Sequence, residues 1–108
     1  MINLVDLSTS IQSLTLPNPT MLASGIMDED AGSMKRVFDS GAGAVVTKSI
    51  GLQARQGHPN PTFVELDYGI LNAMGLPNPG IDAYIEELNE MKSYNGIIIG
   101  SIFGSTEL

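Results

Sequence analysis

The sequence predicts an α/β protein in which strands and helices alternate around a parallel sheet. Short apolar runs that end in small or polar residues occur at 20–25, 44–50 and 97–104. Segments with the apolar spacing of amphipathic helices lie between these runs, from 28 to 41 and from 78 to 92. This alternation is the order of βαβ units, whose strands pair in parallel.

Composition excludes several classes of protein. The chain has 108 residues with 43% hydrophobic content, which is enough for a modest core. It lacks both a signal-peptide pattern and the ~20-residue apolar run of a spanning helix, so we expect no membrane partner. A net charge of −7 with five basic residues argues against nucleic-acid binding. The lack of cysteine argues against a disulfide framework and fits a cytoplasmic protein.

The first 25 residues predict a hairpin followed by a buried strand. Residues 2–7 and 11–16 alternate between apolar and polar side chains, which indicates a short β-hairpin. Residues 17–19 (Pro-Asn-Pro) end this pattern. Residues 20–24 (TMLAS) then predict a parallel strand, closed by Gly25, where the backbone lies close to a ligand.

The next segment predicts the first helix and the second strand. The acidic residues within 28–34 suit a solvated helix entry, where carboxylates interact favourably with the helix dipole. An apolar face follows, and Gly41 marks the end of the helix. Residues 44–50 (AVVTKSI) are almost continuously apolar before Lys48, as in a strand covered on both faces. The residues of the apolar helix face are Met34, Val37 and Phe38.

The second helix is predicted to begin with Asn78 as N-cap and Pro79 as first helical residue. A turn at Asn95-Gly96 follows, and residues 97–99 open a third buried strand that runs to Phe103-Gly104. The apolar face of the helix is formed by Ile81, Tyr84, Ile85, Leu88 and Met91.

A long Gly/Pro-rich segment separates the second strand from the second helix, between Gly51 and Pro77. Loops of this length inside compact domains are usually functional or disordered. Apolar side chains recur within this one, so we expect it to be ordered and functional. It ends in a cluster of polar and apolar residues, Asn72-Ala73-Met74-Gly75-Leu76.

Polar residues at the predicted strand ends are the candidates for chemistry, because ligands bind at the carboxyl ends of parallel strands. These residues are Ser24, Lys48, Ser49 and Ser101, with Asn72 added by the long loop. One cation, several neutral hydrogen-bonding groups and closely approaching backbone suit a planar, anionic small molecule beside a larger cofactor.

Each candidate also has a purely structural interpretation. Lys48 could lie along the surface on its aliphatic stem, and Asn72 could only stabilise a turn. His58 fits a loop residue better than a catalytic base. Residues 28–30 fit a solvated helix entry better than a metal site, because consecutive carboxylates do not converge on one ion. We therefore predict no metal site.

Two complete βα units and a third strand do not close a barrel, which typically needs ~250 residues. We expect residues 1–108 to form the N-terminal portion of a single larger domain, comprising its first three strands and two helices. The alternative is a small α/β module that is complete in itself and not catalytic.

The chain contains, in this order, the motifs NPTMLASG, GAGAVVTKSIG, ARQGHPNPT, NAMGLPNPG and SIFG. In these motifs it resembles a known family, the class I dihydroorotate dehydrogenases. These enzymes are flavin-dependent (β/α)₈ TIM barrels of pyrimidine biosynthesis, and the resemblance covers nearly the whole chain. The sequences of the TKS and GHPNPT segments are most similar to those of the NAD-linked class I-B catalytic subunit.

The resemblance implies an oxidoreductase that acts on CH–CH bonds and oxidises (S)-dihydroorotate to orotate in de novo UMP synthesis. It implies one FMN per full-length subunit, a homodimer and a cytoplasmic location. A class I-B enzyme would also have an iron–sulfur partner subunit that carries FAD and 2Fe–2S and passes electrons to NAD. A related pyrimidine-binding flavin barrel, similar to dihydropyrimidine dehydrogenase, remains an alternative.

The resemblance also implies roles for individual residues. Ser24 would contact FMN, Ser49 would contact it through its backbone, and Lys48 would face both the flavin and the pyrimidine carboxylate. Dihydroorotate or orotate would be bound by the side-chain amide of Asn72 and largely by the backbone of Ala73, Met74, Gly75 and Leu76. Ser101 would touch FMN, although relatives often carry Asn at this position.

The catalytic base of the family is a cysteine in a loop after the fourth strand. This sequence has no cysteine, so we expect no catalytic residue in this chain and the base to lie downstream of Leu108. We predict that the isolated 108 residues neither catalyse the reaction nor hold FMN tightly. They should also tend to self-associate through open sheet edges.

Overall fold

The structure is a computed structural model that describes residues 5–106. Its described part is built around a three-stranded parallel sheet in the order β3-β4-β7. The strands are β3 (Met21–Leu22), β4 (Ala44–Val46) and β7 (Ile98–Ile99). Met21 pairs with Ala44, and Val45 pairs with Ile98. The three strands predicted from the sequence are therefore confirmed as parallel strands of one sheet, although each is shorter than predicted.

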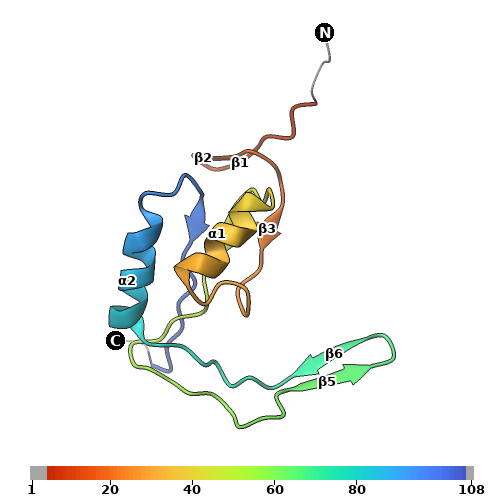
Figure 1. Cartoon of the computed structure of the whole chain (residues 1–108), viewed down its shortest axis with the longest axis vertical. Helices are drawn as coiled ribbons and strands as arrows, with labels where there is room; N and C mark the ends of the chain where they lie inside the picture. The colour runs from red at the N-terminus through yellow and green to blue at the C-terminus, as the bar shows by residue number, and fades with distance from the viewer. Residues whose placement is uncertain (1–4, 107–108) are drawn as a thin grey trace.

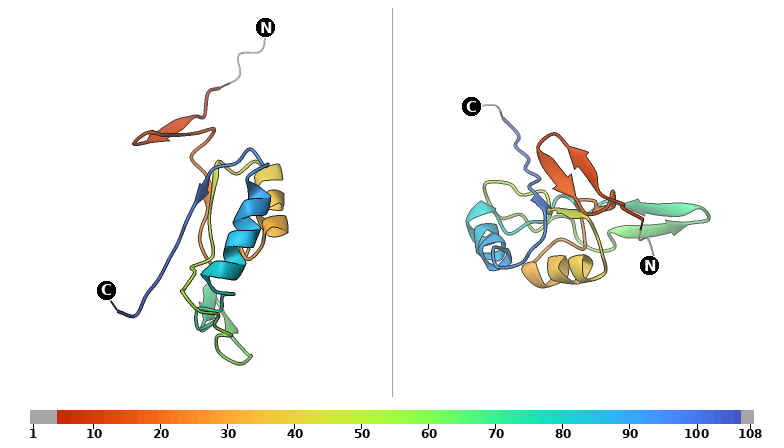
Figure 2. Two further views of the ribbon diagram at one scale, coloured as in Figure 1. Left: turned by 90° about the vertical axis from the view of Figure 1, so that its left-hand side faces the viewer. Right: turned by 90° about the horizontal axis from the view of Figure 1, so that it is seen from above.

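Both helices cover the same face of this sheet (Figure 2). Helix α1 (Ala31–Asp39) connects β3 to β4, and helix α2 (Ile81–Met91) precedes β7. An ion pair between Lys35 and Glu90, 2.7 Å apart, also joins the two helices. Each connection therefore returns across the same side of the sheet, as in βαβ units. No helix within residues 5–106 has the length and hydropathy needed to cross a membrane.

The hydrophobic core lies between the helices and the sheet. Tyr84 and Met91 of α2 reach it as predicted, but Ile85 is 45% exposed. The prediction was wrong for Ile85, whose side chain lies outside the core and is partly exposed. The buried core residues are Ala31, Met34, Val45, Ile50, Tyr84 and Met91, with Leu22, Val37, Phe38, Ile81, Leu88, Tyr94 and Ile98 packed against them.

The N-terminal hairpin is confirmed, but its first strand was misplaced. Strand β1 (Thr9–Ile11) pairs antiparallel with β2 (Leu14–Leu16). Gln12 adopts a φ of 54° and turns the chain directly after β1. Residues 5–7 belong to no strand, and residues 2–4 of the predicted strand lie outside the described residues.

The long segment after β4 contains a hairpin that the sequence did not predict. Strand β5 (Phe63–Leu66) pairs antiparallel with β6 (Gly69–Asn72), and Asp67 and Tyr68 form the turn. The hairpin projects from the body of the chain (Figure 1), and its strand residues are all exposed. The expectation that this segment is ordered is thus borne out.

Helix α2 begins differently from the prediction. Its N-cap is Gly80, with φ 85°, and Ile81 is the first helical residue. Asn78 was predicted as the N-cap, but its side chain is used elsewhere. Its Oδ1 accepts hydrogen bonds from the backbone N–H groups of Gly51 and Gly80, at 3.2 and 3.0 Å. Asn78 therefore links the start of α2 to the end of the second strand segment.

Candidate active site

A pocket of about 610 Å³ opens at the carboxyl ends of β3 and β4. It brings together residues that lie up to 55 positions apart in the sequence. The end of β3 supplies one side, the segment after β4 a second, and the loop after β6 a third. The lining residues are Leu22, Ala23, Ser24, Gly25, Ile26, Met27, Lys48, Ser49, Asn72, Ala73, Met74, Gly75, Leu76 and Pro77. All the residues predicted to bind substrate are in this set.

Three serine hydroxyl groups form a row across the adjacent strand ends. Ser49 Oγ lies 3.1 Å from Ser24 Oγ and 2.8 Å from Ser101 Oγ. Thr47 Oγ1 also accepts a hydrogen bond from the backbone N–H of Ser101, at 2.8 Å. Ser101 does not line the pocket itself, but it is joined to the pocket residues through Ser49. The four predicted cofactor residues are thus neighbours in space.

Lys48 is buried, with 6% of its surface exposed. Its ammonium group donates a hydrogen bond to the carbonyl oxygen of Gly25, at 2.5 Å. The alternative in which Lys48 lies on the surface is therefore wrong, because the fold covers its stem and anchors its charge at the pocket. Lys48 also borders a second, smaller pocket of about 380 Å³ whose lining includes Glu29, Asp30 and Glu87.

The loop between β6 and α2 is held against the preceding segment. The backbone N–H of His58 donates to the carbonyl of Met74 at 2.9 Å, and Ala73 N–H donates to Thr62 O at 2.9 Å. A Cβ on Gly75 would lie 2.6 Å from His58 Cδ2. His58 thus packs against the back of the predicted substrate loop, while the side chain of Asn72 is exposed at its start.

The acidic segment before α1 is only partly what the sequence predicted. Asp30 is the N-cap of α1 and accepts a hydrogen bond from Ser33 N at 2.7 Å, which lowers the pKa of its carboxyl group. Asp28, however, is completely buried. The expectation that it is solvated was wrong, because Tyr84 of α2 covers it and donates a hydrogen bond to its backbone carbonyl at 2.7 Å. No cluster of metal-ligating side chains occurs within residues 5–106.

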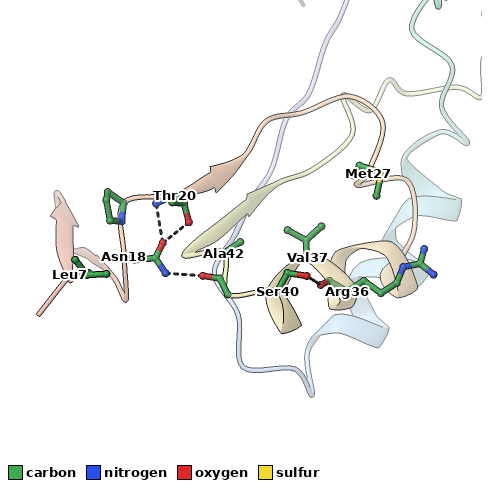
Figure 3. A pocket seen from close by; sticks show the side chains of 10 residues that line it. Leu7, Asn18, Thr20, Met27, Arg36, Val37, Ser40 and Ala42 are labelled. Atoms are coloured by element: carbon green, nitrogen blue, oxygen red, sulfur yellow. Dashed lines mark hydrogen bonds between the residues drawn. The ribbon is translucent and has the colours of Figure 1, made fainter. Parts of the chain in front are cut away.

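A further pocket, of about 690 Å³, lies beside the free edge of β3 and along α1 (Figure 3). Its lining is mainly apolar, with Leu7, Met27 and Val37 around it. Asn18 Nδ2 closes one side by donating to Gly41 O at 2.8 Å. None of the predicted site residues lines it, and among residues 5–106 Arg36 is the only cation in its lining. We therefore assign the candidate site to the pocket at the strand ends, although this one is larger.

Fold and pocket together define an α/β protein with a candidate ligand site at the carboxyl ends of parallel strands. Comparison with known proteins makes this specific. The family model of dihydroorotate dehydrogenase matches residues 6–107. This chain therefore belongs to the dihydroorotate dehydrogenase family.

Individual relatives agree with this assignment. A protein of Methanocaldococcus jannaschii named dihydroorotate dehydrogenase B (NAD(+)), catalytic subunit, is 52% identical over 105 residues, covering 94% of this chain and 34% of the relative. A protein of the same name from Thermoplasma acidophilum is 49% identical, with the same coverage. The chain thus spans about a third of the length of the curated relatives it matches.

A solved structure supports the fold. The crystal structure of DHODH from Eimeria tenella in complex with ferulenol matches with a TM-score of 0.79 at 25% identity. The match covers 90% of this chain and 28% of the other. The described residues therefore adopt the fold of the N-terminal part of a (β/α)₈ barrel, preceded by a short hairpin, as the sequence predicted.

Proposed function

We propose that the full-length protein is an FMN-dependent dihydroorotate dehydrogenase that oxidises (S)-dihydroorotate to orotate in UMP synthesis. The observation that carries the proposal is the strand-end pocket. It gathers a buried, anchored lysine, two serine hydroxyl groups and the loop from Asn72 to Leu76. Family membership supports the same reaction.

The residues present fit a flavin. The hydroxyl groups of Ser24, Ser49 and Ser101 form a row that can donate and accept hydrogen bonds, beside the cation of Lys48. We propose that these four residues hold FMN, which when bound supplies hydride acceptance. Their contribution is to fix position and to offer hydrogen bonds without reorganisation during the reaction.

The pyrimidine is proposed to lie between Lys48 and the loop of Asn72, Ala73, Met74, Gly75 and Leu76. Orotate carries a carboxylate and a ring edge with both donors and acceptors. The ammonium group of Lys48 would bind the carboxylate through a charge-assisted hydrogen bond, and the amide of Asn72 and the loop backbone would fix the ring orientation. Because Lys48 already sits at 6% exposure, little side-chain freedom remains to be lost on binding.

The catalytic base is proposed to lie outside these 108 residues, since the chain has no cysteine. We further propose a homodimer with an electron-transfer partner subunit that carries FAD and 2Fe–2S and reduces NAD. The names of the relatives, which specify a catalytic subunit and NAD, support this branch. The cytoplasmic location and the behaviour of the isolated 108 residues stay predictions.

An anaerobic visible spectrum of the full-length protein tests the proposal. Flavin bands that bleach when dihydroorotate is added would support both the cofactor and the substrate. Bands that persist with dihydroorotate but bleach with a reduced uracil would reject the substrate in favour of another pyrimidine barrel. A colourless protein that does not take up added FMN would reject the function.

A further inference from the structure

Asp28 is a buried carboxylate that the proposed reaction does not use. Its side chain has no exposed surface. Oδ2 accepts a hydrogen bond from the backbone N–H of Gly25 at 2.9 Å. Oδ1 is also buried, and it has no hydrogen-bond partner among the described residues. A buried carboxylate oxygen left unpaired is costly, so its presence calls for an explanation beyond packing.

Gly25 connects Asp28 to Lys48. Its N–H group donates to Asp28, and its carbonyl accepts the hydrogen bond from the ammonium group of Lys48. Gly25 has a φ of 155°, a backbone conformation that residues with a side chain rarely adopt. Glycine has wide backbone freedom, so contacts must hold the direction of its carbonyl. The bond from Gly25 N–H to Asp28 Oδ2 links residues 25 and 28 and so closes a short turn that includes this carbonyl.

The direction of the Gly25 carbonyl matters because Lys48 borders two pockets, and its ammonium group could point into either. One is the strand-end pocket, and the other contains the carboxylates of Glu29, Asp30 and Glu87. An unanchored ammonium group would be drawn toward these carboxylates. The bond to Gly25 O holds it at the carboxyl end of β3 instead.

We propose that Asp28 is a positioning residue that keeps Lys48 directed toward the substrate by fixing Gly25. Tyr84 completes the support, because its hydroxyl group donates to the backbone carbonyl of Asp28 and so ties the segment to α2. The role of Lys48 toward the substrate rests on the proposed function. The geometry of Lys48 does not, and the experiment separates the two.

The test compares Asp28→Ala with Asp28→Asn in the full-length protein. The asparagine has nearly the same shape and keeps an oxygen that accepts from Gly25 N–H, whereas the alanine does not. Asp82→Ala is the matched control, since it removes an exposed carboxylate of α2 that lines neither pocket beside Lys48. If Asp28→Ala fails to fold, Asp28→Ser replaces it, because its hydroxyl group is one atom shorter and does not reach Gly25 N–H.

Two readouts are measured on each variant. The first is the rate at which an amine-reactive reagent labels Lys48, determined by mass spectrometry with exposed Lys92 as internal reference. The second is the dissociation constant of orotate. We expect Asp28→Ala to raise both by about tenfold or more, the scale of one hydrogen bond to a charged group. Asp28→Asn and Asp82→Ala should stay within about threefold of wild type on the same scale.

Unchanged labelling of Lys48 in Asp28→Ala would overturn the proposal, as would equal acceleration at Lys48 and Lys92, which indicates general loosening. Asp28→Asn as impaired as Asp28→Ala would overturn the assignment to the Gly25 hydrogen bond. Selective acceleration at Lys48 supports the positioning role even if orotate does not bind wild type. Failure of the wild-type protein to bind orotate would reject the proposed function but not the positioning role of Asp28.

Discussion

Asn78 and Gly51 are joined by a hydrogen bond of 3.2 Å, from the backbone N–H of Gly51 to Asn78 Oδ1, across 27 residues of sequence. The same oxygen accepts from Gly80 N–H, and Asn78 Nδ2 donates to Leu76 O at 3.0 Å. One buried side chain therefore fixes the end of the second strand segment, the start of α2 and the end of the proposed substrate loop.

The first prediction is that Asn78→Ala destabilises the full-length protein by about 2–4 kcal/mol. The substitution leaves three backbone groups without their partner, and two of them belong to buried glycines. Urea unfolding measures the loss. Asn89→Ala on the exposed face of α2 is the control and should stay within about 0.5 kcal/mol of wild type. Equal stability of the two variants would contradict this role of Asn78.

Lys48→Met is predicted to weaken orotate binding roughly 10- to 100-fold, the loss of a hydrogen bond between charged groups. Methionine retains much of the apolar stem, so the fold should persist. Calorimetric titration with orotate measures the effect. Lys35→Met is the control, because it removes a lysine whose ion pair with Glu90 is on the surface. A Lys48→Met protein that binds orotate as wild type does would exclude Lys48 from the carboxylate site.

Much of the candidate site was predictable from the sequence, because ligand sites of parallel sheets lie at the carboxyl ends of the strands. Strand ends in a parallel sheet share an edge, so Ser24, Lys48 and Ser49 were expected to meet, and they do line one pocket. Alternation of short apolar runs with amphipathic segments was likewise sufficient for the βαβ order. These features depend on local patterns, which a single sequence displays.

The features that the sequence did not predict depend on distant contacts. Asp28 looked solvated beside Glu29 and Asp30, and only the packing of Tyr84 buries it. Asn78 looked like a helix cap because its partner Gly51 is remote in the sequence. The β5–β6 hairpin had a weak signal, since its Asp67-Tyr68 turn lacks the Asn-Gly or Asp-Gly pair typical of tight hairpins.

Stability at high pH should depend on Tyr84. Burial, with the nearby Asp28 carboxylate, raises the pKa of the Tyr84 hydroxyl from 10.0 to about 12. Below pH 10 this group is protonated in both the folded and the unfolded chain. Between pH 10 and 12 it ionises only in the unfolded chain, so the free energy of unfolding falls as pH rises, by at most about 2–3 kcal/mol.

In the Tyr84→Phe variant, the decrease in the free energy of unfolding that comes from ionisation of Tyr84 should be absent. The variant should be less stable than wild type at pH 8, by about 1 kcal/mol for the lost bond to Asp28 O. Above pH 10 this difference should shrink and then change sign by pH 12, because the loss of about 2–3 kcal/mol in wild type exceeds it. Urea unfolding at several pH values measures it. Tyr68→Phe, at a side chain that is 95% exposed, provides the control. A Tyr84→Phe curve parallel to wild type up to pH 12 would contradict the assignment.

The last prediction concerns the proposed substrate loop. Gly75 has a φ of 78°, and a Cβ there would lie 2.8 Å from the backbone nitrogen of His58 and 2.6 Å from its ring. Gly75→Ala must therefore both strain the backbone and push the loop away from the segment that supports it. We expect a destabilisation of about 1–3 kcal/mol, because the positive φ disfavours a residue with a side chain.

Gly75→Ala should also lower the affinity for orotate by about tenfold. The loop backbone from Ala73 to Leu76 is proposed to contact the ring, and a small displacement of the loop breaks such contacts. Gly69→Ala is the matched control. It lies at the start of β6, where a Cβ would have nothing within 4 Å, and it should preserve both stability and affinity. If Gly75→Ala lost stability but bound orotate normally, the loop would support the fold without contacting the substrate.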